Sequence, residues 1–316
     1  MLQLAAVALA NHAAQPAPQL YWNSLLPNTQ MPRAISELLH PDSTNEEKST
    51  NIMSAVGNGK PTDHKGKPEN IPMANVLYNN RYDHPTDNQL HYKNVAIFFL
   101  ENDMRPGATT NFQFARNSNM ATFLPRVSAQ SIPFSSNKLS EIFNHFSVKP
   151  TSVEAKTIKQ TIEECEAPGV KGEEKYCATS LESMVDFSTS KLRTRNVQAI
   201  STEVLEKGAT MFVHKYTTMP GLKKLAGDKV VVCHKQNYPY AVFYCHAIKS
   251  TAAYVLSLKG DVGVKVKAVA ICHLDTSEWS PKHLAFQILK VKPGKIPICH
   301  FLPTDHIVWV PNHKSA

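Results

Sequence analysis

Four cysteines of this chain are each followed directly by a histidine, and these dipeptides constrain the fold more than any other feature of the sequence. Ten residues separate the first dipeptide from the second, 25 separate the second from the third, 25 separate the third from the fourth, and eight more lead to Trp309. Four of the six cysteines take part, which a random scatter of 14 histidines does not explain. The dipeptides are Cys233-His234, Cys245-His246, Cys272-His273 and Cys299-His300.

The direct adjacency of the two residue types predicts that they have different roles. In a β-strand, successive side chains point to opposite faces, so a cysteine and the histidine after it cannot easily bind one small metal ion together. We therefore expect the thiols to pair on one side and the imidazoles to converge on the other.

The cysteines predict structural disulfides if the chain enters an oxidising compartment. Sequence alone does not choose among the connectivities open to six cysteines. Cys165 with Cys177 is the first pair that we expect, because Pro168-Gly169 between them can turn the chain back. A zinc site is the alternative, but closely spaced cysteine knuckles are absent. The candidate disulfide residues are Cys165, Cys177, Cys233, Cys245, Cys272 and Cys299.

The candidate metal ligands are the histidines of the four dipeptides, His234, His246, His273 and His300. One such histidine alone is best interpreted as a structural side chain, but four in register with cysteines favour a binding site. Since the thiols are expected in disulfides, a site made of imidazoles suits Cu(II) better than a soft metal. His214 is a weaker candidate for a further ligand, and the loops around His283 and His306 are equally typical of solvent-exposed positions.

The chain divides into three parts by composition. Residues 1–14 form a short apolar stretch that ends in small residues, which we interpret as the remnant of a signal segment, although it lacks basic residues at its start. Residues 15–94 are rich in Pro, Asn, Asp, His and Lys and predict an extended leader or linker. The main domain is expected over residues 95–312. No apolar run of about 18 residues occurs, so a membrane span is not expected.

Helices are predicted ahead of most of the strands. Thr151 and Thr179 each stand three residues before a glutamate, which is the spacing of a capping box. They predict helices over residues 152–166 and 180–191, and a shorter helix is expected in the leader at residues 34–40.

Beyond Lys229, apolar and polar side chains alternate, as in residues 262–268, and this is the period of a half-buried strand. The fold class is therefore α+β, with helices preceding a mainly antiparallel, β-rich C-terminal region. Further strands are expected at residues 95–104, 230–233, 241–246, 254–258, 286–291 and 307–310.

The spacing CH-x10-CH-x25-CH-x25-CH-x8-W resembles the pattern of the plant BURP-domain family. Phe98-Phe99 stands where that family has a paired phenylalanine, and Cys165 and Cys177 match its two additional cysteines. The leader between Gln19 and Pro32 is also similar to the segment that commonly precedes the domain. The resemblance implies a single disulfide-linked BURP domain, with a layout most similar to the seed-protein-like branch.

The resemblance to BURP peptide cyclases implies a copper cofactor at the Cys-His histidines. Those enzymes cross-link a Tyr or Trp side chain of a core peptide, which lies in the same chain or in a separate one. Tyr78, Tyr82 and Tyr92 are the candidate substrate side chains here, but no repeated Gln-Pro-x5-Trp unit occurs. This absence argues against cyclisation of the chain's own leader and leaves a separate peptide substrate open. Whether the protein is an enzyme stays open at this point.

The net charge of +8 favours an acidic partner through long-range attraction. Acidic cell-wall polysaccharide is one candidate partner. Nucleic acid is not expected, because no basic run is interleaved with aromatic residues. The resemblance implies a plant protein of the apoplast or the seed storage vacuole, with a role in seed development, stress response or the cell wall.

Overall fold

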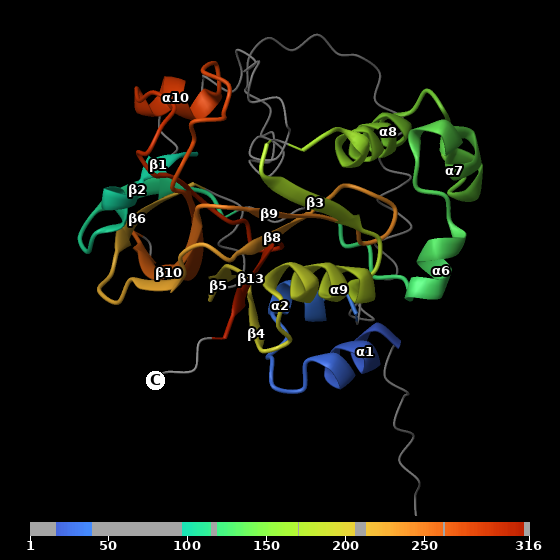
Figure 1. Cartoon of the computed structure of the whole chain (residues 1–316), viewed down its shortest axis with the longest axis horizontal. Helices are drawn as coiled ribbons and strands as arrows, with labels where there is room; N and C mark the ends of the chain where they lie inside the picture. The colour runs from blue at the N-terminus through green and yellow to red at the C-terminus, as the bar shows by residue number, and fades with distance from the viewer. Residues whose placement is uncertain are drawn as a thin grey trace, which may run out of the picture.

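Two antiparallel sheets form the centre of the protein in the computed structural model (Figure 1). The structure describes residues 17–39, 97–114, 119–169, 171–205, 213–261 and 263–312. Within these ranges one sheet has eight strands and the other has five, and each strand pairing is antiparallel. The predicted α+β class with a β-rich C-terminal region is confirmed.

The eight-stranded sheet is built around a long hairpin of β10 and β11. Along β11, Lys265 and Lys267 are exposed while Val266 and Ala268 are buried, which is the alternation expected of a half-buried strand. The path runs β1-β12-β11-β10-β6-β2, with β5 beside β11 and β7 beside β10. The strands are β1 (Phe99–Leu100), β2 (Thr109–Phe112), β5 (Glu203–Val204), β6 (His214–Thr218), β7 (Lys223–Ala226), β10 (Thr251–Gly260), β11 (Lys265–His273) and β12 (Ile298–Phe301).

The five-stranded sheet runs in the order β3-β9-β8-β13-β4. Its central strand β8 is buried along its whole length, as expected for a strand that is covered on both faces. The strands are β3 (Glu173–Ala178), β4 (Val197–Ile200), β8 (Val231–Lys235), β9 (Phe243–Ile248) and β13 (Ile307–Pro311).

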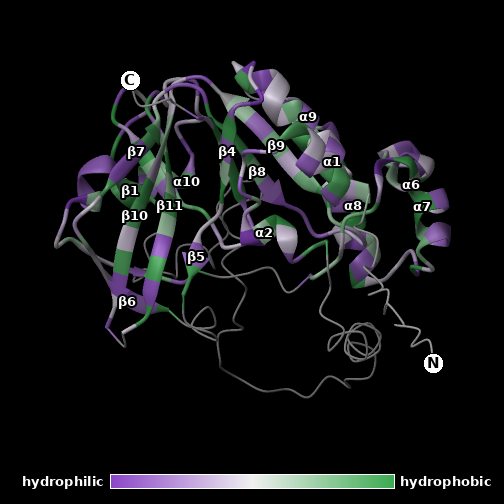
Figure 2. Ribbon diagram, turned by 90° about the horizontal axis from the view of Figure 1, so that it is seen from below, coloured by the Kyte–Doolittle hydropathy of each residue, from purple (hydrophilic) through white to green (hydrophobic). Residues whose placement is uncertain are grey.

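The two sheets pack face to face through a small apolar core. Val232 and Val308 of the five-stranded sheet meet Val269 and Ile271 of the eight-stranded sheet, and all four are buried. Figure 2 shows β10 and β11 of one sheet beside β4 and β8 of the other, with α9 and α1 beyond the second sheet. Each sheet therefore has an inner face toward the other sheet and an outer face with a core of its own.

Helix α9 (Leu181–Leu192) covers the outer face of the five-stranded sheet. Its residues Met184 and Val185 are fully buried against that sheet, whose outer core includes Phe243 and Trp309. The leader helix α1 (Ala17–Leu25) joins this core, because the Trp22 ring lies 5.5 Å from the Trp309 ring and is 2% exposed. The remaining helices are α2 (Arg33–Ser36), η1 (Glu101–Met104), α6 (Arg126–Ser131), η2 (Ser136–Lys138), α7 (Leu139–His145), α8 (Val153–Glu166) and α10 (Leu284–Leu289).

Both long helices predicted from the sequence are present, but each begins one residue later and has a different cap. Helix α8 is capped by Ser152, whose hydroxyl accepts from the Ala155 amide, and α9 is capped by Ser180. The predicted cap residues Thr151 and Thr179 stand just outside. The leader helix expected at residues 34–40 is the short α2 followed by a turn, and residue 40 lies outside the described ranges.

The strand predicted at residues 286–291 is wrong, because residues 286–289 belong to helix α10 and residues 290–291 follow its end. A short apolar run does not distinguish a strand from a buried helix by its periodicity. Here His283 caps the helix by accepting from the Ala285 amide, and Lys290 ends it in the left-handed conformation. Of the run at residues 95–104, the described part 97–104 has a strand at Phe99–Leu100 alone, and a 3-10 helix follows it.

Three parts of the expected organisation concern residues that the structure does not describe. The segment 1–14, most of the leader 15–94, and the candidate tyrosines Tyr78, Tyr82 and Tyr92 lie outside the described residues. Among the helices that are described, none combines the length and the apolar composition needed to cross a membrane.

Candidate metal centre

The strand register pairs four of the cysteines directly. Cys233 of β8 stands opposite Cys245 of β9, and Cys272 of β11 stands opposite Cys299 of β12. Each pair is a disulfide with its Cα atoms 4.0 Å apart. A third disulfide joins Cys165 of α8 to Cys177 of β3, which is the pair expected first. All six cysteines are therefore bonded, and no thiol is left for the zinc alternative.

The four histidines that follow these cysteines lie on the inner faces of the two sheets. The cysteines belong to the outer cores, whereas Val232, opposite His246, and Ile271, opposite His300, belong to the core between the sheets. Residues directly opposite each other in an antiparallel pair share a face. The structure thus places the disulfides outside and the imidazoles between the sheets, in the arrangement that the sequence predicts.

The imidazoles of the five-stranded sheet form a hydrogen-bonded chain. The Nε2 atoms of His234 and His246 are 3.0 Å apart, and the Nδ1 atoms of His234 and His306 are 2.9 Å apart. At the other end, Nδ1 of His246 lies 2.7 Å from Oε1 of Glu173 on strand β3. Glu173 also accepts a hydrogen bond from the Tyr244 hydroxyl at 3.1 Å. Three imidazoles are thereby connected in line to one carboxylate.

The imidazoles of the eight-stranded sheet are stacked instead. The rings of His273 and His300 are 5.7 Å apart with an interplanar angle of 23°. The indole of Trp279 lies 5.0 Å from the His273 ring and 4.4 Å from the His283 ring. Nδ1 of His273 is buried and has no hydrogen-bond partner within the described ranges. A buried nitrogen without a partner costs free energy, and a bound ligand would remove that cost.

Burial lowers the pKa of four of the histidines, His234, His273, His300 and His306. It lowers the pKa of His234 and of His273 well below the usual value, and the neighbouring imidazoles lower both further. Burial also lowers the pKa of His300 and of His306 to about 4. The two pairs act on each other, because His246 of one sheet contributes to the lowered pKa of His273 on the other. Neutral imidazole is the form that binds metal ions.

The donor chemistry fits a copper ion, but the side chains are not yet gathered around one point. Two imidazole nitrogens that share an ion at about 2.0 Å and at roughly a right angle are about 2.8 Å apart, and the His234 and His246 Nε2 atoms are close to that separation. Within the described ranges, no three His, Cys, Asp or Glu side chains lie close enough to hold one metal ion. Joining the two pairs around one ion therefore requires side-chain movement.

The structure changes the interpretation of the other histidines. The sequence leaves open whether His306 is exposed, and the structure buries it, since it is 2% exposed. It lies one residue before the buried strand β13, and that position is the signal in the sequence that could have placed it. His283 packs against Trp279 and Phe98 and caps α10. His214 contacts Tyr216 and lies 3.7 Å from the Asp261 carboxylate.

The comparison with protein families decides the family. The model of the BURP domain matches residues 97–311, which include the three disulfides and the four paired histidines. The chain belongs to the BURP family. The BURP segment also includes Glu173 and His306, whereas the leader helices α1 and α2 precede it.

Three plant relatives illustrate the similarity of the full chain. It is 42% identical to the BURP domain protein RD22 of Arabidopsis thaliana, covering 94% of this chain and 94% of that protein. It is 50% identical to BURP domain-containing protein 3 of Oryza sativa subsp. japonica, covering 78% of this chain and 57% of the relative. It is 36% identical to the BURP domain-containing protein BNM2A of Brassica napus, with coverages of 71% and 82%. The BURP family assignment made from the Cys-His spacing is confirmed.

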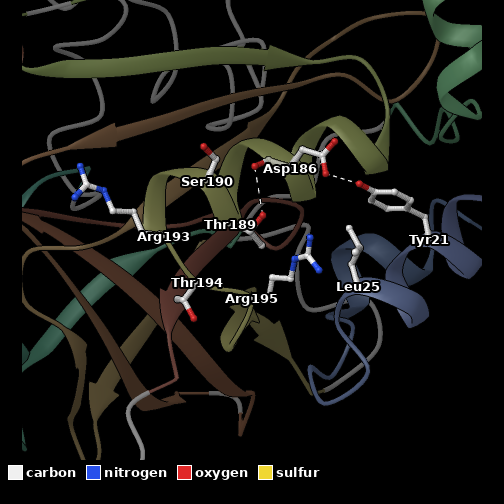
Figure 3. A pocket seen from close by; sticks show the side chains of 8 residues that line it. All are labelled: Tyr21, Leu25, Asp186, Thr189, Ser190, Arg193, Thr194 and Arg195. Carbon is white, nitrogen blue, oxygen red and sulfur yellow. Dashed lines mark hydrogen bonds between the residues drawn. The ribbon is translucent and has the colours of Figure 1, made fainter.

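A separate pocket of about 430 Å³ lies between the leader helix α1 and helix α9 of this BURP protein. Arg193 and Arg195 line it together with Tyr21, whose hydroxyl donates to Asp186. Figure 3 shows Arg195 extending toward Leu25 of α1. Among the ion pairs of the described residues, none includes either of these two arginines.

Proposed function

We propose that this plant BURP-domain protein binds copper through His234, His246, His273 and His300. The observation that carries the proposal is the placement of two imidazole pairs on the facing inner surfaces of the sheets. Each pair is fixed from behind by a disulfide between the preceding cysteines. Burial lowers the pKa of His234 and of His273, which favours the neutral form that binds metal, and within the described ranges the buried Nδ1 of His273 has no hydrogen-bond partner.

The donor set favours copper over other metals. The thiols are occupied by disulfides, so a site here offers imidazole nitrogen, which suits Cu(II). When bound, copper supplies one-electron redox chemistry with dioxygen as the terminal oxidant. The chain's own residues hold the ligands in register and surround them with the apolar core between the sheets.

Copper uptake by the purified full chain tests the proposal. We expect a defined copper-to-protein ratio by elemental mass spectrometry after removal of excess metal, and its loss when the four histidines become alanine. His145→Ala is the matched control, because this histidine is exposed on α7. Copper retained at the wild-type ratio by the fourfold variant would overturn the proposal, provided that both variants keep their three disulfides.

A second candidate function is a copper-dependent peptide cyclase that cross-links Tyr or Trp side chains in cis or in trans. The packing of the Trp279 indole against the ring of His273 supports it, since an aromatic ring already lies against this imidazole. Each cross-link removes two hydrogen atoms from the peptide and reduces one dioxygen to hydrogen peroxide. Intact mass spectrometry after aerobic incubation with copper should show the loss of two hydrogens, and Tyr78, Tyr82 and Tyr92 are the positions to map first.

A third candidate is binding of acidic cell-wall polysaccharide, supported by the two arginines of the pocket beside α9. Guanidinium groups bind carboxylates with two hydrogen bonds each. We expect salt-resistant retention on polygalacturonate to fall when Arg193 and Arg195 become alanine. The matched control replaces the exposed Lys171 and Lys295, which changes the net charge equally. Equal losses in both variants would reduce the interaction to general charge attraction.

The disulfides and the family support the proposed cellular setting. Three disulfides persist in an oxidising compartment, which supports the apoplast or the seed storage vacuole. A role in seed development, stress response or the cell wall belongs to the same proposal. Imaging of the full-length protein fused to a fluorescent protein in plant cells tests the location, and a purely cytosolic signal would contradict it.

A further inference from the structure

The imidazole chain of the five-stranded sheet ends on a carboxylate that the copper proposal does not use. Glu173 lies on the edge strand β3, its side chain is 7% exposed, it lies within hydrogen-bond distance of His246 Nδ1, and it accepts from the Tyr244 hydroxyl. Its neighbour Glu174 points to the opposite face, where it forms an ion pair with Lys191 and is largely exposed. Burying a carboxylate is costly unless it is hydrogen-bonded, so the contact with His246 is a built feature of the site.

The carboxylate of Glu173 at one end of the row of imidazoles determines which nitrogen donates in each hydrogen bond of that row. Oε1 of Glu173 accepts from the Tyr244 hydroxyl, and the same oxygen lies 2.7 Å from Nδ1 of His246. If this oxygen accepts both hydrogen bonds, Nδ1 of His246 carries a proton. In the neutral ring, Nε2 of His246 then has a lone pair and accepts from Nε2 of His234. Nδ1 of His234 is in turn an acceptor, and its donor is Nδ1 of His306. Each donor thus points toward Glu173.

We propose that Glu173 is a positioning residue that sets the tautomers of His246, His234 and His306 and keeps Nε2 of His246 without a proton. The effect of Glu173 on copper affinity rests on the proposed copper function. Its effect on the tautomers does not depend on copper. Hydrogen bonds from a ligand imidazole to a carboxylate fix the ring and raise its basicity. Glu173 therefore prepares His246 as a ligand before any metal arrives.

The chain also has to rearrange when both facing Nε2 atoms act as ligands. His234 then holds its proton on Nδ1 and donates to Nδ1 of His306, whose own proton is held on Nε2. No proton is gained or lost in this change, and His246 keeps its proton toward Glu173. His246 therefore already has the tautomer of an Nε2 ligand in the copper-free protein, whereas His234 has to change its tautomer.

Nuclear magnetic resonance of the copper-free full chain, with ¹⁵N-labelled histidine, tests the tautomers directly. We expect His246 and His306 to be protonated on Nδ1 and His234 on Nε2. In Glu173→Gln, the amide can present either an acceptor or a donor, so His246 and His234 should become mixtures. Glu174→Gln is the matched control on the opposite face and should leave all three tautomers unchanged.

Two results would overturn the positioning role. One is a wild-type His246 that is protonated on Nε2, a result that does not depend on the folding of any variant. The other is a Glu173→Gln protein whose three tautomers are those of the wild type. Glu173→Asp keeps the charge and should restore the single tautomer of His246, which separates the charge from the packing of the side chain.

Copper titration of the same proteins tests the link to the proposed function. We expect the dissociation constant for Cu(II) to rise by roughly 10- to 100-fold in Glu173→Gln and to stay at the wild-type value in Glu174→Gln. If the wild type takes up no copper, the copper function fails while the tautomer measurement still decides the role of Glu173. If the wild type binds copper and Glu173→Gln binds it equally well, the positioning role fails and the copper function stands.

Discussion

The two sheets present the same Cys-His arrangement and surround it differently. On the five-stranded sheet, the facing imidazoles His234 and His246 are hydrogen-bonded to each other and held from behind by His306 and Glu173. On the eight-stranded sheet, His273 and His300 are stacked, and the His273 Nδ1 atom has no partner within the described ranges. The two imidazoles of the first pair are therefore joined by a hydrogen bond, whereas those of the second pair are in contact through their ring faces. The same Cys-His dipeptide can therefore place its histidine in different surroundings.

Removal of either cross-strand disulfide should give the largest effect. The double variants Cys233→Ala with Cys245→Ala and Cys272→Ala with Cys299→Ala should each lose about 2–5 kcal/mol of unfolding free energy. The second bond closes the longer loop, with a sequence separation of 27 against 12, and should cost about 0.7 kcal/mol more by loop entropy. Chemical denaturation of the copper-free proteins measures both. A larger loss of unfolding free energy on removal of the Cys233–Cys245 disulfide, which closes the shorter loop, would show that packing decides which disulfide stabilises the protein more.

Replacing one histidine of each pair by alanine should lower the unfolding free energy by different amounts, because one pair is hydrogen-bonded and the other is stacked. His234→Ala leaves the facing nitrogens of His246 and His306 without their buried partner and should cost about 3 kcal/mol. His273→Ala also removes a nitrogen that has no partner and should cost about 1 kcal/mol. Thermal and denaturant unfolding of the copper-free variants measures the difference. Equal costs would contradict the contrast between the sheets.

The lowered pKa values predict acid sensitivity of the copper-free protein. The pKa of His300 and of His306 is about 4 in the folded state and about 6.5 in the unfolded state, so the unfolded state binds more protons in between. Stability is thus fully present above pH of about 6.5 and falls as the pH drops toward 4. The slope is about 1.4 kcal/mol per pH unit for each such histidine. His300→Gln and His306→Gln should each reduce the slope of unfolding free energy against pH, and unchanged slopes would contradict the assignment.

The smallest effect concerns the Tyr244 hydroxyl, which also donates to Glu173. Tyr244→Phe should cost about 0.5–1.5 kcal/mol, because one hydrogen bond to a carboxylate is lost while the carboxylate keeps His246. The tautomer of His246 should stay that of the wild type. Denaturant unfolding and ¹⁵N resonance of the same sample report the two quantities separately. A changed tautomer would mean that the hydroxyl, and not the carboxylate alone, orders this pair.

The central feature of the site could be predicted because it depends only on local geometry. Adjacent residues in a strand point to opposite faces, so the separation of disulfides from imidazoles followed from the dipeptides themselves. The caps of α8 and α9 were shifted by one residue because each threonine is followed by a serine, and both hydroxyls are suitable caps. The helix at α10 was taken for a strand because its apolar run is short.

The partners of the histidines depended on long-range pairing that the sequence does not display. Glu173 reaches His246 only because the polar edge strand β3 pairs with β9, and its mixed charges do not indicate a strand. Asp305 before His306 is equally typical of an exposed loop, so the sequence leaves its burial open; β13 lies between β8 and β4, and His306 beside it is buried. Glu173 and His306 therefore reach the site through strand pairing between distant segments, whereas the proposed ligands can be recognised from the Cys-His dipeptides alone.

The contact of Trp22 with Trp309 sets the size of the unit that must fold together. Trp22 and Ile35 complete the outer core of the five-stranded sheet from a segment that precedes the BURP match. A chain cut to residues 97–311 would expose an apolar surface over Trp309 and would be prone to self-association. Conversely, a protease that cleaves between residues 40 and 96 should yield two pieces that stay together under native conditions and separate only on denaturation. The N-terminal piece then behaves as a tightly bound subunit of its own domain.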